Sequence, residues 1–141
     1  MAGFSRKSGD DRGYQKLTIS SLALVAGDLV AFDRSNAKVI KATSSSSIED
    51  LAGVVVEATT SADTQALVQK ITKDDLYEAP TTNSTNTTHN YQRMVLTDEN
   101  EVNNTGTDST SDAAVFVQLY PVGATGDKKI VGFFNINLDR A

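Results

Sequence analysis

The side chains that could do chemistry in this chain are one histidine and scattered carboxylates, because the sequence contains no cysteine. The histidine, His89, lies in residues 81–90, a run of threonine, asparagine and serine. A Ser-His-Asp site needs a general base that the fold holds in position, and one imidazole cannot make a histidine-rich zinc site. The absence of cysteine excludes disulfides and thiolate metal sites. We therefore predict that the chain is not an enzyme.

Oxygen ligands for a hard cation are concentrated in residues 98–108. Asp98 and Asn100 match the first two ligand positions of an EF-hand loop, with Glu99, Glu101, Asn103 and Asp108 nearby. The match fails after that, because Val102 takes the third ligand position and Gly106 comes late. We expect a solvated acidic loop here and no metal.

Two other patterns point to chemistry only weakly. Paired carboxylates for glycoside hydrolysis could come from Asp28, Asp33, Glu57 or Asp139, but the chain has no tryptophan and no aromatic cluster to grip a sugar. Residues 123–129, GATGDKK, superficially resemble the end of a P-loop but lack its spacing and a following helix. We predict a hairpin turn there and no cofactor. A small hydrolase remains a third interpretation.

The elements that would carry these side chains are predicted to be strands. Short β-branched runs bounded by Gly, Asp, Ser and Asn indicate strands and turns. Asp33-Arg34-Ser35-Asn36 is expected to close a hairpin onto residues 38–41, because Asp and Asn satisfy backbone groups locally. Residues 66–71 suit a strand better than a short helix, and residues 130–134 should be the most buried strand. The fold class is all-β, a small β-barrel or β-sandwich (β-tulip-like) with an extended N-terminal arm.

Composition divides the chain into an arm and one domain. Residues 1–16 contain three glycines and six charges, so we expect a flexible arm. Residues 17–141 are predicted to form a single β domain with exposed polar loops at residues 81–90 and 97–112. The first 20 residues carry a charge of +2 and the rest −7, which makes nucleic acid an unexpected partner. The chain contains no run of about 18 apolar residues, so we expect no membrane span, and we expect no secretory signal.

One segment resembles a known family. After the arm, the chain reads L-x-x-GDLV-x-x-D, then K-V-x-K-A and GVVVE, followed by polar insertions. This pattern, best between residues 17 and 57, resembles the small β-barrel decoration or cement proteins of tailed-phage heads. The resemblance implies a homotrimer, made in the host cytoplasm, that binds the major capsid protein on the outside of the virion and clamps neighbouring subunits.

Two interpretations of function follow. In the first, the arm adds a strand to a neighbouring sheet edge, and its removal leaves the body folded. Its interface residues would be two apolar anchors and four basic contacts: Phe4, Tyr14, Arg6, Lys7, Arg12 and Lys16. In the second, the chain is a receptor- or glycan-binding head module, in which the Thr/Asn-rich loops make the contacts with Tyr91 and His89.

Overall fold

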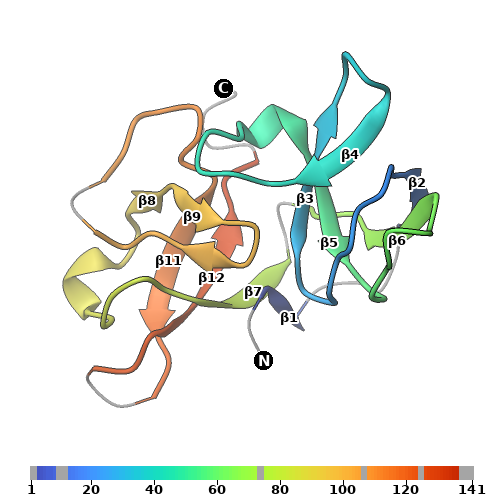
Figure 1. Cartoon of the computed structure of the whole chain (residues 1–141). Coiled ribbons are helices and arrows are strands. Elements are labelled where there is room, and N and C mark those ends of the chain that lie inside the picture. Colours follow the sequence, from blue (N-terminus) through green and yellow to red (C-terminus); the bar gives the residue numbers. More distant parts are fainter. Residues whose placement is uncertain (1–2, 9–12, 73–74, 106–107, 124–125, 137–141) are drawn as a thin grey trace.

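The computed structural model describes residues 3–8, 13–72, 75–105, 108–123 and 126–136. These residues form two five-stranded antiparallel sheets (Figure 1). Sheet A contains, in spatial order, β1 (Ser5–Ser8), β7 (Leu76–Pro80), β12 (Lys129–Phe134), β11 (Phe116–Pro121) and β8 (Arg93–Met94). Sheet B contains β2 (Tyr14–Thr18), β6 (Gln65–Gln69), β5 (Leu51–Val55), β3 (Leu29–Asp33) and β4 (Lys38–Lys41). A two-stranded ribbon, β9 (Leu96–Asp98) with β10 (Glu101–Val102), and the 3₁₀ turns η1 (Ile48–Asp50) and η2 (Thr87–His89) complete the elements.

The two sheets pack against each other through one hydrophobic core. Sheet A contributes Tyr77, Phe116 and Phe134, and sheet B contributes Leu29 and Leu51. A second core lies on the other face of sheet B, because side chains alternate along a strand: Leu29 and Ala31 face the first core, whereas Val30 faces the second. The all-β prediction is confirmed, and the packed sheets make a sandwich.

Sheet B is curled but does not close into a barrel. Cα atoms of its two edge strands, β2 and β4, approach within 8 Å, yet no ladder of hydrogen bonds joins them. Of the two fold alternatives, the sandwich is therefore the better description of the residues that the structure covers.

The predicted hairpin is confirmed in detail. Asp33 and Lys38 are paired at the end of the β3–β4 ladder. Asn36 donates its backbone N–H to the carbonyl of Asp33 at 3.3 Å and its side-chain amide to the Asp33 carboxylate at 2.8 Å. The strand predicted for residues 66–71 is confirmed over residues 66–69, which belong to β6, and the strand ends before residues 70 and 71. The most buried strand is β5, all five of whose residues are buried, rather than residues 130–134 of β12, where Phe133 is half-buried.

The prediction of a flexible N-terminal arm is wrong for the part of residues 1–16 that the structure describes. β1 pairs with β7, and β2 pairs with β6, so each sheet takes one of its edge strands from residues 5–18. Phe4 is only 2% exposed and packs on Phe116 and Phe134, with ring centroids 5.6 and 5.2 Å apart. Backbone pairing needs few apolar side chains, so the polar composition of this segment was misleading.

The two polar loops are also more ordered than expected. Residues 81–90 include η2 and the buried Thr81, whose backbone forms a parallel bridge to Val102. Residues 97–112 include β10, and Val102 is fully buried while Asn104 is 3% exposed. Most residues of the two stretches are exposed or half-buried, but their polar groups bond one another and bury a few residues, which composition does not reveal.

Candidate interaction surfaces

The most exposed strand is β2 at one edge of sheet B. Four of its five residues are exposed, and only Leu17 is half-buried. A groove of about 230 Å³ lies between β2 and the β3–β4 hairpin; its lining residues are Leu17, Thr18, Phe32, Asp33, Arg34, Ala37, Lys38 and Val39. We call β2 with this lining the β2 groove. An edge strand beside an apolar groove is the kind of surface that accepts an extended segment of another protein.

The hairpin side of the β2 groove is held by polar contacts. The Arg34 guanidinium lies 5.5 Å from the centre of the Phe32 ring and also donates to the Asp50 carboxylate at 3.2 Å. The Asn36 amide, followed by the Ser35 hydroxyl, holds the pKa of the Asp33 carboxyl below its usual value. The groove therefore combines an apolar floor with a fixed, mainly basic rim.

The predicted interface residues are divided between the two sheets. Phe4 is a core residue and cannot be an external anchor. Lys7 lies on β1, where its Nζ is 3.5 Å from the Glu78 carboxylate, which in turn contacts Lys129 Nζ at 3.2 Å. Arg6 lies beside it on β1, half-buried. Tyr14 and Lys16 are exposed on β2. Arg12 lies outside the described residues.

The two polar loops meet through amide side chains. Asn104 Oδ1 accepts the backbone N–H of Asn83 at 2.8 Å, and Asn104 Nδ2 donates to the Asn83 carbonyl at 2.9 Å. The hydroxyls of Thr82 and Thr97 are also in hydrogen-bond contact. The two loops therefore contact each other through hydrogen bonds. The bridge between Thr81 and Val102 joins them directly after the end of β7.

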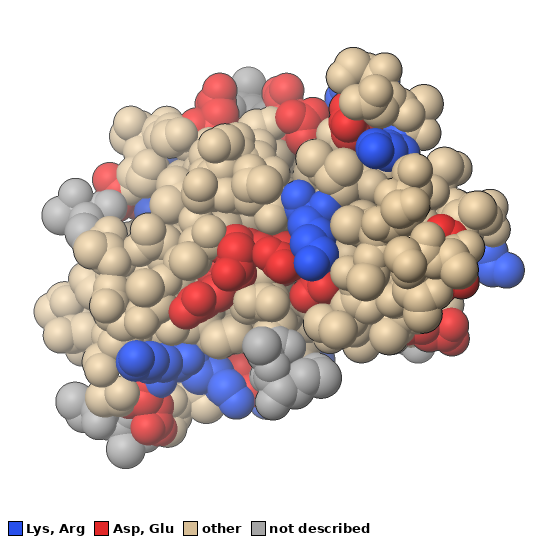
Figure 2. All heavy atoms as spheres, viewed as in Figure 1, with Lys and Arg blue, Asp and Glu red and all other residues tan. Residues whose placement is uncertain are grey.

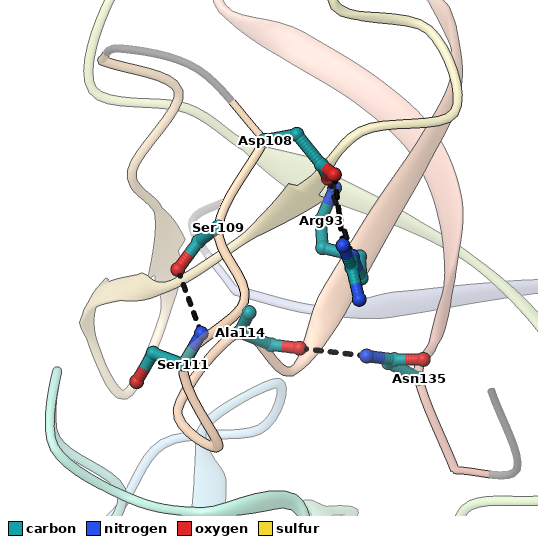
Figure 3. A network of polar contacts seen from close by, with 6 residues as sticks. All are labelled: Arg93, Asp108, Ser109, Ser111, Ala114 and Asn135. Carbon is teal, nitrogen blue, oxygen red and sulfur yellow. Dashed lines mark hydrogen bonds and ion pairs between the residues drawn. The ribbon is translucent and has the colours of Figure 1, made fainter. Parts of the chain in front are cut away.

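Residues 108–115 are fastened across the edge of sheet A (Figure 3). Arg93 on β8 donates its Nη2 to Asp108 Oδ2 at 2.9 Å and its backbone N–H to Oδ1 at 2.6 Å. These hydrogen bonds lower the pKa of the Asp108 carboxyl. Asn135 Nδ2 donates to the Ala114 carbonyl at 3.0 Å, which ties the far end of the segment to the strand region after β12. The β8 edge is consequently covered.

A group of charges joins sheet B to the β9–β10 ribbon. Asp28 is 2% exposed, and its Oδ2 accepts the N–H of Val25 at 3.0 Å. Burial raises the pKa of the Asp28 carboxyl, and the nearby Glu99 adds to this effect, whereas the Val25 N–H and Lys41 oppose it. Lys41 Nζ lies 3.6 Å from Glu99. Figure 2 shows acidic side chains in a band across this face with basic side chains beside them.

The calcium pattern does not assemble a cage in the described part of the chain. No group of three or more His, Cys, Asp or Glu side chains is placed there to hold a metal ion. Asp98 instead accepts the backbone N–H of Asn100 at 3.0 Å, as in a turn. Gly106 lies outside the described residues, and the absence of a metal stays a prediction.

The second interpretation named His89 and Tyr91, and the structure places both beside η2. Tyr91 is 74% exposed and has a positive φ of 70°. Its backbone N–H donates to the Gln118 carbonyl at 2.6 Å. The buried Gln118 amide donates to the Asn86 carbonyl at 2.9 Å and to Asn90 Oδ1 at 2.8 Å. Hydrogen bonds to Gln118 thus hold the backbone that carries the exposed Tyr91 ring.

Sequence reasoning missed three of these features. Asn104 and Gln118 are buried polar residues, and nothing in their local sequence distinguishes them from solvated neighbours. The β2 groove was missed because Tyr14 and Lys16 were assigned to an arm. A signal was available only for β2, where residues 14–18 have strand-forming types at two of five positions, Tyr14 and Thr18.

Among the described residues, no helix is long and apolar enough to cross a membrane. Comparison of the chain with protein-family models and with curated proteins found no match.

Proposed function

We propose that this chain is a structural protein of a phage head that binds the outer surface of the capsid and stabilises neighbouring subunits. In this proposal the partner is the major capsid protein, the chain acts as a homotrimer, and it is located on the exterior of the virion after synthesis in the host cytoplasm. The proposal rests on the resemblance of residues 17–57, which contribute β3, β4 and β5 to sheet B.

The observation that carries the proposal is the β2 groove. A cement protein must add contact area between subunits while remaining a rigid module itself. β2 is an edge strand of sheet B with four exposed residues, and the groove beside it offers apolar area at Leu17 and Phe32. Backbone pairing with a capsid segment would supply affinity, and the groove would supply selectivity.

The contact differs from the arm of the sequence-based prediction. Phe4 is part of the core, so removal of residues 1–16 would remove a core aromatic, the edge strand β1 and most of the edge strand β2. The binding groups are instead Tyr14 and Lys16, which project from a strand that is already part of the domain. Point substitutions on β2 are therefore the proper test.

The experiment is co-sedimentation of the purified chain with mature capsids from the same genome, counting bound copies per capsid subunit. Saturable binding near one copy per subunit is expected. The Tyr14→Ala/Lys16→Glu double variant should bind at least about tenfold more weakly, the loss expected for a central interface contact. Tyr91→Asn, at a distant site, is the matched control and should bind as the parent chain does. Absence of saturable binding by the folded parent chain would refute the proposal.

A further inference from the structure

Tyr91 is the most exposed of the large hydrophobic side chains in the described part of the chain. An exposed ring alone does not indicate a binding site, but the backbone conformation of Tyr91 is unusual, with a positive φ. A positive φ is uncommon and strained for a bulky residue, so it persists only where the surroundings impose it. Here they do impose it, so the ring is held out into solvent by a constrained loop.

Five hydrogen bonds hold this conformation. The backbone of residues 91 and 92 pairs with Gln118 on β11, through Tyr91 N to the Gln118 carbonyl at 2.6 Å and Gln118 N to the Gln92 carbonyl at 3.3 Å. The fully buried Gln118 amide then binds Asn86 and Asn90 on either side of η2. η2 itself is capped by Asn86, whose side chain accepts the Thr88 N–H at 2.9 Å. A ring presented this way loses little conformational entropy on binding.

The chemistry around Tyr91 is polar and uncharged. Residues 81–92, TTNSTNTTHNYQ, contain no Asp, Glu, Lys or Arg. Asparagine, glutamine and threonine side chains both donate and accept hydrogen bonds, so they suit a ligand whose groups also do both. A second exposed tyrosine, Tyr120, lies two residues beyond Gln118 on β11 and is 49% exposed. The surroundings therefore select neither an anion nor a cation.

We propose that Tyr91 is the aromatic platform of a binding site for neutral carbohydrate. A sugar ring presents C–H groups on its faces and hydroxyls around its rim, which match an exposed aromatic ring on a segment rich in amide and hydroxyl side chains. The site is separate from the capsid-binding surface, because η2 and β2 lie at opposite sides of the molecule (Figure 1, yellow turn at the left and β2 at the right). The chain could therefore hold a capsid with one side and a glycan with the other.

The test is a titration of the isotope-labelled full chain with neutral hexasaccharides of glucose, mannose and N-acetylglucosamine, followed through backbone amide resonances. Saturable shifts confined to residues 86–92 and 118–120 are expected with at least one of them. Tyr91→Asn removes the ring, while asparagine tolerates the positive φ, and it should weaken binding by about tenfold or more. Tyr91→Phe keeps the ring and should stay within a few-fold of the parent.

Three outcomes would overturn the site. One is the absence of saturable shifts with every neutral hexasaccharide at millimolar concentration. Another is unchanged affinity in a folded Tyr91→Asn variant. The third is binding only to a sulfated hexasaccharide, which would show charge recognition elsewhere. Tyr14→Ala is the matched control, a half-exposed tyrosine on β2, and should bind sugar normally. Because capsid sedimentation is measured separately, failure here is distinguishable from failure of the capsid proposal.

Discussion

The Asn104 side chain bonds the backbone of Asn83 through both of its polar atoms, accepting at 2.8 Å and donating at 2.9 Å, across 21 residues of sequence. It imitates the pairing of one strand with another, and it does so between two segments whose composition predicts exposed loops. The same amide reaches the Ser84 carbonyl at 3.3 Å. Asn104 is therefore the buried amide among the residues that join the two polar loops.

Replacing Asn104 with alanine should lower the free energy of unfolding by roughly 2 kcal/mol, because it removes the hydrogen bonds that this buried amide makes to the Asn83 N–H and to the Asn83 and Ser84 carbonyls. Urea denaturation measures this loss. Asn103→Ala is the matched control: the Asn103 side chain accepts only the nearby Thr105 N–H at 2.9 Å, so a smaller loss is expected. Equal losses in the two variants would contradict the role assigned to Asn104.

Phe4→Ala should destabilise the chain by about 3–5 kcal/mol, the usual range for emptying a buried phenylalanine site. The reason is that Phe4 packs between Phe116 and Phe134 in the core between the sheets. Chemical denaturation measures this loss of unfolding free energy, and the Tyr14→Ala variant on the exposed strand β2 is the comparison. A Phe4 variant as stable as the parent would restore the flexible arm of the sequence-based prediction.

Asp28 and Asp33 should give opposite dependences of stability on pH. The pKa of Asp28 is raised by burial, so the folded state binds its proton more tightly than the unfolded state, and stability falls as the pH rises from about 4 through the folded-state pKa. Asp28→Asn should remove this fall and gain stability at neutral pH, since its side-chain oxygen can still accept the Val25 N–H.

The pKa of Asp33 is lowered by its bond to the Asn36 amide, so its contribution is present above about pH 4 and disappears as the pH falls through the folded-state pKa. Asp33→Asn should therefore lose stability at neutral pH. Unfolding free energies of both variants between pH 2 and 8 test the pair, and a change of the same sign in the two variants at neutral pH would be inconsistent with these pKa directions.

A double-mutant cycle should find a weak coupling between Arg93 and Asp108, about 0.5–1 kcal/mol, because both side chains are partly exposed and water screens the pair. The variants are Arg93→Gln, Asp108→Asn and their combination, each measured by thermal unfolding at low and high salt. Coupling should decrease with salt. A coupling of several kcal/mol would mean that the pair is more shielded than its exposure indicates.

The sequence by itself determined the features that depend on neighbouring residues. Asp33 and Asn36 encode the β3–β4 turn because their side chains satisfy the turn's own backbone, and the β-branched runs encode strands because they suit a pleated surface. These interactions span only a few residues, so they are visible in a local pattern.

Only the tertiary structure decided where residues 3–8 and 13–18 lie and which residues of the polar loops are buried. β1 pairs with β7, more than 60 residues away, through backbone groups that every residue carries and that leave no mark on composition. Asn104 and Gln118 are buried because partners distant in sequence satisfy their amides. The exposed ring of Tyr91 follows from the same cause, since the backbone of Gln118 fixes its conformation. Contacts between distant segments, which local patterns cannot encode, therefore set both proposed binding surfaces.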